Sequence, residues 1–466
     1  MRSDTKKLNQ VVFFNLLGPV ILNGINFFTI PIFTRLLGTE NYGVYTIYAS
    51  YQAILVIFMG LQTQAIIAPT SIYYNGENRD KCFSNALTIS LLSSLLLSAV
   101  IGVFIMPISR FTGLSVTMIV IMLLHSIGMV GAQWALFKFT YDKQAKTNFF
   151  VSVGIAVSGV LLSLLFIQGL MKDEKPYLGY ALGHAIPYVL AGVVFFVYFL
   201  AKGKSFFSKK EWAFCLALCL PIVFHGLSNT LLHQCDKVMI QKFMGDASAG
   251  IYGFAVSFAN VMNIIFNALN TTWVPFYHDD IKENRKEQLK TKTKNYVFLY
   301  TCLSIGFIMA MPEVVKLFAQ SDFWPSIKLI PILVVGTYFA FLYTFPVNFE
   351  FYYKKTKTIA IGTSLACVAN ILLNYFLIQQ FGMIGAAVAT LLSYALLYLF
   401  HLFIAKVVIK EEYHYPYKFF YLYLAVVILF AALFYFIIDL VWIRWTIFLV
   451  AAALVVMKIF KNKSIF

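Results

Sequence analysis

Charged residues are scarce in this chain, and their scarcity excludes an ordinary water-soluble protein. Only 12% of its 466 residues are Asp, Glu, Lys or Arg, whereas 60% are hydrophobic and 17% are aromatic. The mean hydropathy is +0.79. A soluble domain of this length needs more polar surface than such a composition supplies. Most of the chain is therefore expected to lie within a lipid bilayer.

Several kinds of chemical site are also missing from the sequence. The six cysteines are scattered, and the pair Cys215 and Cys219 has no second pair to complete a zinc site or a disulfide framework. No Walker lysine motif is present, so ATP hydrolysis within the chain is not expected. We expect no metal and no cofactor. Because the loops are short, no extramembrane domain remains to hold an active site, and the chain is not expected to be an enzyme.

Long apolar runs fill the remaining sequence. Each is about 20 residues or longer, enough for a helix to cross a hydrocarbon core roughly 30 Å thick. The runs predict an all-α integral membrane protein with about 14 spanning helices. We place them near 11–34, 43–69, 82–107, 115–138, 147–170, 178–201, 212–240, 249–275, 295–318, 326–351, 358–379, 383–406, 418–438 and 443–459.

The net charge of +16 would suggest nucleic acid in a soluble protein, but here its distribution indicates membrane orientation instead. Of the 36 Lys and Arg residues, 27 fall in one set of alternating loops and at both termini, seven fall in the other set, and two lie within spans. Basic loops stay on the cytoplasmic side of a membrane. This bias predicts that both termini are cytoplasmic, and we expect no nucleic acid partner.

The first and second parts of the chain resemble each other at a spacing of roughly 207 residues. Residues 38–45 (GTENYGVY) match 245–252 (GDASAGIY), and residues 141–147 (YDKQAKT) match 352–358 (YYKKTKT). A further match pairs Gly179 with Gly385, and Tyr188 and Tyr394 follow in register. The order of these matches predicts two parallel six-helix repeats, an architecture typical of transporters. The predicted lobes are 1–205 and 206–410, with a helix pair at 411–466 outside the repeat.

Two segments carry a resemblance to a known family. Residues 30–45 (IPIFTRLLGTENYGVY) resemble the first-hairpin signature of bacterial polysaccharide transporters of the O-antigen flippase (Wzx) type, and residues 236–252 (DKVMIQKFMGDASAGIY) resemble the corresponding second-lobe signature. The resemblance implies the fold shared by multidrug, oligosaccharidyl-lipid and polysaccharide exporters, a MATE-like arrangement. It also implies a lipid-linked oligosaccharide as substrate, moved from the inner to the outer leaflet of the bacterial cytoplasmic membrane, with membrane lipids and other polysaccharide assembly proteins as partners.

Polar side chains recur on single faces of three predicted spans. At about 100° per residue, the members of each stripe fall within a narrow arc of their helix. Amides and imidazoles facing hydrocarbon are costly, so the stripes should face other helices or water. They indicate either a hydrated cavity that binds sugar hydroxyl groups or hydrogen bonds that hold the bundle together. The stripes are Asn15, Asn23 and Asn26 in the first span, His225, Asn229, His233 and Asp236 in the seventh, and Asn260, Asn263, Asn267 and Asn270 in the eighth.

Charged residues at the ends of spans supply further candidates. Arg35 and Lys242 occupy equivalent repeat positions, and Asp236 and Lys237 lie toward the predicted outer end of the seventh span. They indicate either a cationic outer gate for the pyrophosphate, with Asp236 as its partner, or anchors at the membrane interface. Glu350 is the remaining candidate for coupling transport to H⁺ or Na⁺, although its place near a span end is also typical of an interfacial residue.

We therefore predict a flippase that works by alternating access of two lobes. His225, Asn229, Asn263 and Asn267 are its candidate glycan contacts, while Arg35, Asp236 and Lys237 are candidates for handling the pyrophosphate. One alternative is an ion-coupled multidrug exporter, and another is a lipid II flippase. A membrane polysaccharide polymerase is less favoured, because no large outer loop with clustered arginines is present.

Overall fold

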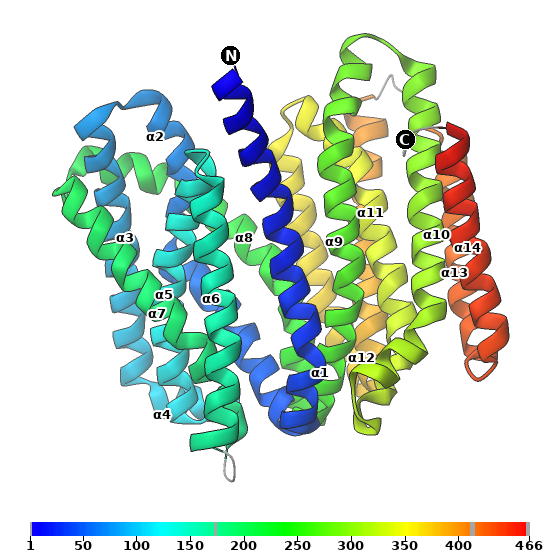
Figure 1. Cartoon of the computed structure of the whole chain (residues 1–466), viewed down its shortest axis with the longest axis horizontal. Coiled ribbons are helices and arrows are strands. Elements are labelled where there is room, and N and C mark those ends of the chain that lie inside the picture. The colour runs from blue at the N-terminus through cyan, green and yellow to red at the C-terminus, as the bar shows by residue number, and fades with distance from the viewer. Residues whose placement is uncertain (1, 172–174, 411–414, 463–466) are drawn as a thin grey trace. The chain divides into compact units, whose positions relative to one another are not determined.

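In the computed structural model, which describes residues 2–171, 175–410 and 415–462, the described chain is helical and contains no strand (Figure 1). This confirms the prediction of an all-α membrane protein. The helices are α1 (Arg2–Gly60), α2 (Ile67–Tyr73), α3 (Gly76–Val103), α4 (Ile105–Thr112), α5 (Val116–Tyr141), α6 (Ala145–Leu165), α7 (Pro176–Gly203), α8 (Lys209–Met244), α9 (Asp246–Lys282), α10 (Lys286–Phe318), α11 (Ile330–Tyr352), α12 (Thr356–Phe403), α13 (Tyr417–Ile437) and α14 (Val441–Asn462). Short 3₁₀ or π turns lie at η1 (Thr63–Ile66), η2 (Phe166–Leu170), η3 (Ser321–Lys328) and η4 (Ile404–Val408).

Twelve helices of the described chain are long and apolar enough to cross a membrane, and two of them hold two spans each. Helices α1 and α12 turn back at Gly38 (φ 66°, ψ −179°) and Gly382 (φ 58°, ψ −138°). Gly245, which joins α8 to α9, has nearly the same conformation as Gly38, with φ 88° and ψ 175°. A side chain would be strained at these angles, so each turn needs glycine. The twelve helices thus accommodate the fourteen predicted spans.

The chain divides into two units, residues 1–234 and residues 235–466. The division falls inside α8, so the first part of that helix belongs to the first unit. The lobes predicted at 1–205 and 206–410, and the separate helix pair at 411–466, remain a prediction.

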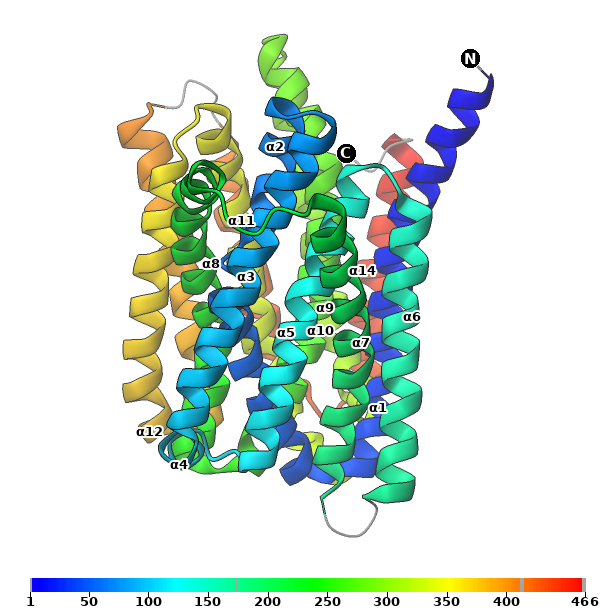
Figure 2. The same cartoon turned by 90° about the vertical axis from the view of Figure 1, so that its left-hand side faces the viewer.

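Close backbone packing holds the first unit together. Helices α3, α5 and α7 pack against one another, and α6 packs against both α1 and α7 (Figure 2). A Cβ added at Gly192 of α7 would lie 2.3 Å from the Gly128 carbonyl oxygen of α5, and one at Gly128 would lie 2.6 Å from the backbone of Tyr188. Small residues let membrane helices approach this closely, which replaces the hydrophobic driving force that lipid removes.

Aromatic side chains fill the second unit. Tyr300 packs against Phe341 with ring centroids 4.2 Å apart, and Trp273 packs against Tyr296 at 5.3 Å. Helices α13 and α14 lie beside α10 (Figure 1). Arg444 of α14 is 1% exposed, donates to the Met309 carbonyl oxygen at 2.8 Å and binds the Glu313 carboxylate with two nitrogens. This ion pair clamps the C-terminal helices onto α10.

Candidate functional site

The predicted stripe on α8 has an exposed part in the first unit and a buried end in the second. His225, Asn229 and His233 are exposed. Asp236 is buried: its Oδ2 accepts a hydrogen bond from the Tyr252 hydroxyl at 2.8 Å, and its Oδ1 accepts one from the backbone N–H of Lys237, also at 2.8 Å. The Asp236 carboxylate is therefore held by α9 rather than presented at a surface.

Two asparagines on α12 extend the polar cluster beside Asp236. Asn370 and Asn374 are completely buried, and the Asn374 amide donates to the Asn370 side-chain oxygen at 2.9 Å. The Cys235 thiol donates to the same oxygen at 3.0 Å. The sequence analysis did not single out these residues, although their spacing of four places them on one helix face and was the available signal.

The asparagine stripe on α9 is accessible along most of its length. Asn260 and Asn267 are exposed, while Asn263 and Asn270 are partly buried. The Asn263 amide donates to Asn260 at 3.4 Å, and Asn270 accepts from Asn348 of α11 at 3.1 Å. Asn270 thus bonds between helices, whereas Asn267 remains open to a ligand.

The candidates on α1 are less buried. Asn23 is partly buried, and Asn26 and Arg35 are exposed. The side chain of Asn15 lies outside the described part of the structure.

Glu350 is fully buried within the second unit. Its Oε1 lies 2.5 Å from Nδ1 of His401 on α12, and its other oxygen accepts a hydrogen bond from the Thr358 hydroxyl. His401 is also fully buried, and its Nε2 has no hydrogen-bond partner among the described residues. His401 could not be predicted as the partner, because the two residues are 51 positions apart in different spans.

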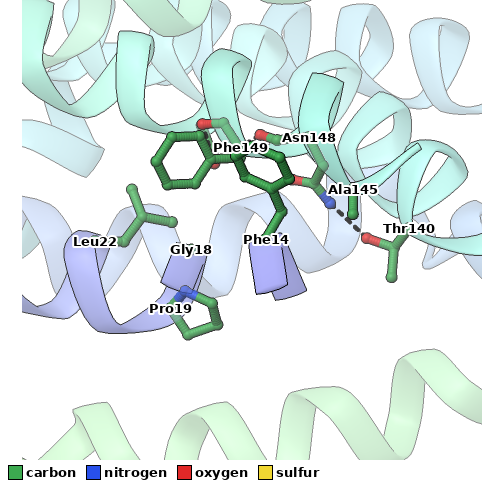
Figure 3. Close-up of a pocket in the computed structure, with 9 residues that line it drawn as sticks. Phe14, Gly18, Pro19, Leu22, Thr140, Ala145, Asn148 and Phe149 are labelled. Carbon is green, nitrogen blue, oxygen red and sulfur yellow. Dashed lines mark hydrogen bonds between the residues drawn. The ribbon is translucent and has the colours of Figure 1, made fainter. Parts of the chain in front are cut away.

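A pocket of about 340 Å³ lies in the first unit, between α1 and the start of α6. Figure 3 shows Pro19 and Leu22 of α1 on one side and Phe149 on the other. The Asn148 amide donates to the Thr140 hydroxyl at 2.5 Å and to the Leu136 carbonyl oxygen at 3.1 Å. Both N–H bonds of the Asn148 amide are engaged within the protein, so this amide offers the pocket no free donor. Most of the atoms that line the pocket are apolar.

An apolar groove of about 450 Å³ lies in the second unit, where α9 and α10 meet α14. Met262, Phe307 and Phe448 are among the residues that line it. Its chemistry suits a hydrocarbon chain rather than a sugar. Within the described residues, no three His, Cys, Asp or Glu side chains come together in a way that could hold a metal ion.

The family model described as "Polysaccharide biosynthesis protein" matches residues 8–279. Among curated proteins, the Lsg locus putative protein 1 of Haemophilus influenzae is 23% identical over 361 residues, covering 74% of this chain and 85% of the relative. A second relative from the same organism, described as an uncharacterized membrane protein, is 23% identical over 366 residues, covering 75% of this chain and 85% of its own length.

Solved structures of two transporters share the fold. The lipid II flippase MurJ in its inward closed conformation superposes with a TM-score of 0.69 at 17% identity, covering 93% of this chain and 98% of its own. An inward-facing MATE family multidrug transporter of the MOP superfamily gives 0.67 at 16% identity, covering 86% and 99%. At these identities the likeness extends to the fold alone, and it confirms the MATE-like architecture implied by the sequence.

Proposed function

Because the chain belongs to the polysaccharide biosynthesis protein family, we propose that it is a flippase for a lipid-linked oligosaccharide. The substrate is carried on a polyprenyl pyrophosphate and moves from the inner to the outer leaflet of the bacterial cytoplasmic membrane, by alternating access of two lobes, for O-antigen or a related surface glycan. An ionic head group cannot cross roughly 30 Å of hydrocarbon unaided. A carrier gives it a path through water and polar side chains.

The observation that carries this proposal is the set of accessible amides and imidazoles on membrane-spanning helices. His225 and Asn229 in the first unit and Asn267 in the second are exposed, and Asn263 is partly so. These neutral donors and acceptors match sugar hydroxyl groups. Arg35 and Lys237 supply positive charge for the pyrophosphate, and Asp236 holds the end of α8 against α9 through Tyr252. The apolar groove beside α14 has the chemistry for the lipid tail.

The alternative of a drug–cation antiporter is less well supported. Multidrug exporters with a carboxylate in the first lobe would need a buried Asp or Glu there, and among the described residues of the first unit none is buried. The buried carboxylates of the described chain, Asp236, Asp280 and Glu350, all lie in the second unit.

Glu350 is the proposed coupling residue, and His401 is the partner that suits it to H⁺ rather than Na⁺. A carboxyl group and an imidazole in contact can hold one proton between them, and Thr358 steadies the second carboxyl oxygen. The pair is closed to water here, so proton exchange requires the surrounding helices α11 and α12 to part. Three exposed lysines lie close to Glu350 in the sequence. Lys354 and Lys355 follow α11, and Lys357 lies in the first turn of α12.

The test is surface glycan in cells whose own gene is deleted and replaced by variants. Arg35→Ala, Asp236→Ala and Asn267→Leu should each reduce surface glycan at least tenfold, while the amount of transporter in the membrane stays unchanged. Thr271→Val, one turn from Asn267, is the matched control, because its hydroxyl only bonds the Asn267 carbonyl oxygen of its own helix. Normal export by all three variants would assign these residues to structure alone. Normal export after deletion would overturn the proposed function.

A further inference from the structure

The second membrane-spanning segment, predicted as one helix at 43–69, is broken. Helix α1 ends at Gly60, and the chain resumes as the 3₁₀ turn Thr63–Ile66 and then α2. Between them, Leu61 and Gln62 both adopt the left-handed conformation, with φ 47° and φ 53°. A residue with a side chain loses about 1–2 kcal/mol in this conformation. Two such residues in succession persist only where their surroundings compensate.

Serine hydroxyl groups from α3 supply that compensation. Ser93 donates to the Phe58 carbonyl oxygen at 2.9 Å. Ser90 donates to the Gly60 carbonyl oxygen at 3.1 Å. The Ser94 hydroxyl lies 3.3 Å from the Met59 carbonyl oxygen, although its closer acceptor is the Ser90 carbonyl oxygen at 2.7 Å. The carbonyls of Phe58, Met59 and Gly60 are those that a broken helix leaves without partners, and an unpaired carbonyl is costly in a membrane. The break is therefore stabilised by specific contacts with α3 in the first unit.

The break lies level with the centres of the neighbouring helices of the first unit, which is where the middle of the membrane is expected. Ser90 stands at the midpoint of α3, which is 28 residues long. A Cβ added at Gly60 would lie 3.3 Å from Val130, near the midpoint of α5, and Gly226 at the midpoint of α8 lies against Gln62. Three neighbouring helices thus meet the break at their centres. Irregular backbone at this depth is tolerated where it is buried in protein or lines a polar cavity.

The break brings two amide side chains to this depth. The Gln64 amide donates to the Gln62 side-chain oxygen at 2.7 Å, and both residues are partly accessible. A Cβ added at Gly226 would lie 3.4 Å from Gln62 Nε2, so the amide reaches α8. The exposed side chains of His225 and Asn229 lie beside Gly226 on that helix. The Gln62 amide thus adjoins the polar stripe of α8, and Gln64 is bonded to it.

We propose that the Gln62–Gln64 pair is a sugar-binding element, which hydrogen-bonds hydroxyl groups of the glycan head within the first unit. The pair still offers the N–H groups of Gln62 and the side-chain oxygen of Gln64, a donor and an acceptor side by side, as adjacent sugar hydroxyls require. This inference rests on the proposed function and adds residues that the predicted stripes did not include.

Adjacent glycine substitutions separate sugar binding from a purely mechanical role of the break. Leu61 and Gln62 have nearly the same φ, and glycine suits both positions. Gln62→Gly keeps the break but removes an amide, and it should lower glycan export about tenfold when substrate is limiting, as expected for one lost hydrogen bond of about 1.4 kcal/mol. Leu61→Gly relaxes the same backbone but keeps both amides, and it should export within twofold of the unaltered protein.

The measurement is surface glycan per transporter in the deletion strain, with an inducible glycosyltransferase that varies the amount of the cell's own lipid-linked glycan. Gln62→Gly and Gln64→Ala should recover export as substrate is raised, because their defect is in binding. Failure of Leu61→Gly with normal export by Gln62→Gly would make the break a hinge and overturn the proposal. So would a Gln62→Gly defect that extra substrate does not relieve. Unchanged export after gene deletion would instead reject the flippase function itself.

Discussion

The two predicted repeats place different chemistry at equivalent positions. Glu350 stands two residues before Tyr352 and His401 seven after Tyr394, and their equivalents in the first repeat are Phe139 and Phe195. Both pairs are in contact: the carboxylate and imidazole at 2.5 Å, the two phenyl rings with centroids 5.6 Å apart. In the first unit, two apolar rings therefore make the equivalent contact. The Glu350–His401 pair of the second unit is thus not needed for this kind of helix contact, which is why we propose it for coupling.

The second spans of the two predicted repeats also differ, and here the first unit has the unusual feature. The break at Leu61 and Gln62 has its equivalent at Ala268 and Leu269, where α9 continues without interruption. The first unit presents amides where a helix is broken, whereas the second places asparagines along an intact helix. The two predicted repeats thus carry polar side chains in their second spans by two different routes.

The largest effect is expected when the Glu350–His401 pair is replaced by phenylalanines, the residues at the equivalent positions of the first unit. Glu350→Ala alone leaves His401 in a dry site and should lower the free energy of unfolding by about 3–5 kcal/mol. The double variant Glu350→Phe with His401→Phe copies the first unit, so it should regain stability but lose glycan export. Thermal unfolding in detergent and surface glycan measure the two effects. Full export by the stable double variant would reduce the pair to packing.

The Arg444–Glu313 ion pair holds α14 against α10, and both helices belong to the second unit. Its loss should therefore affect that unit selectively. Arg444→Ala removes charge-assisted bonds to Glu313 and should cost about 3 kcal/mol. Limited proteolysis should then cut near residues 438–441 in the turn between α13 and α14, while fragments from the first unit keep their rates. Equal loosening of both units would show that the clamp stabilises the whole chain.

The turn glycines should behave alike in the two units. Gly38 and Gly245 have nearly the same conformation, and space for a Cβ is open at both. Alanine at either position should therefore cost only backbone strain, about 2 kcal/mol. Unfolding midpoints of Gly38→Ala and Gly245→Ala should shift by similar amounts. A shift confined to one variant would break the equivalence of the two turns.

The elements predicted from sequence were those that depend on local chemistry. The apolar runs indicated the spans, and the repeated glycines marked turns that only glycine can form. The Glu350–His401 pair escaped prediction because periodicity assigns a residue to a helix face but does not say which faces meet. The break at Leu61 escaped for a related reason: its compensation comes from Ser90, Ser93 and Ser94, a helix away. The roles of the asparagine and histidine stripes in transport stay predictions.

The buried clamp between Arg444 and Glu313 also has a consequence for synthesis. The two residues are 131 positions apart, so at about 5–20 residues per second the ribosome adds Arg444 some 7–26 s after Glu313. Throughout that interval the carboxylate on α10 has no arginine to bind. Closure of the clamp is therefore among the last steps of assembly, and a chain truncated before α14 would leave the Glu313 carboxylate without its arginine.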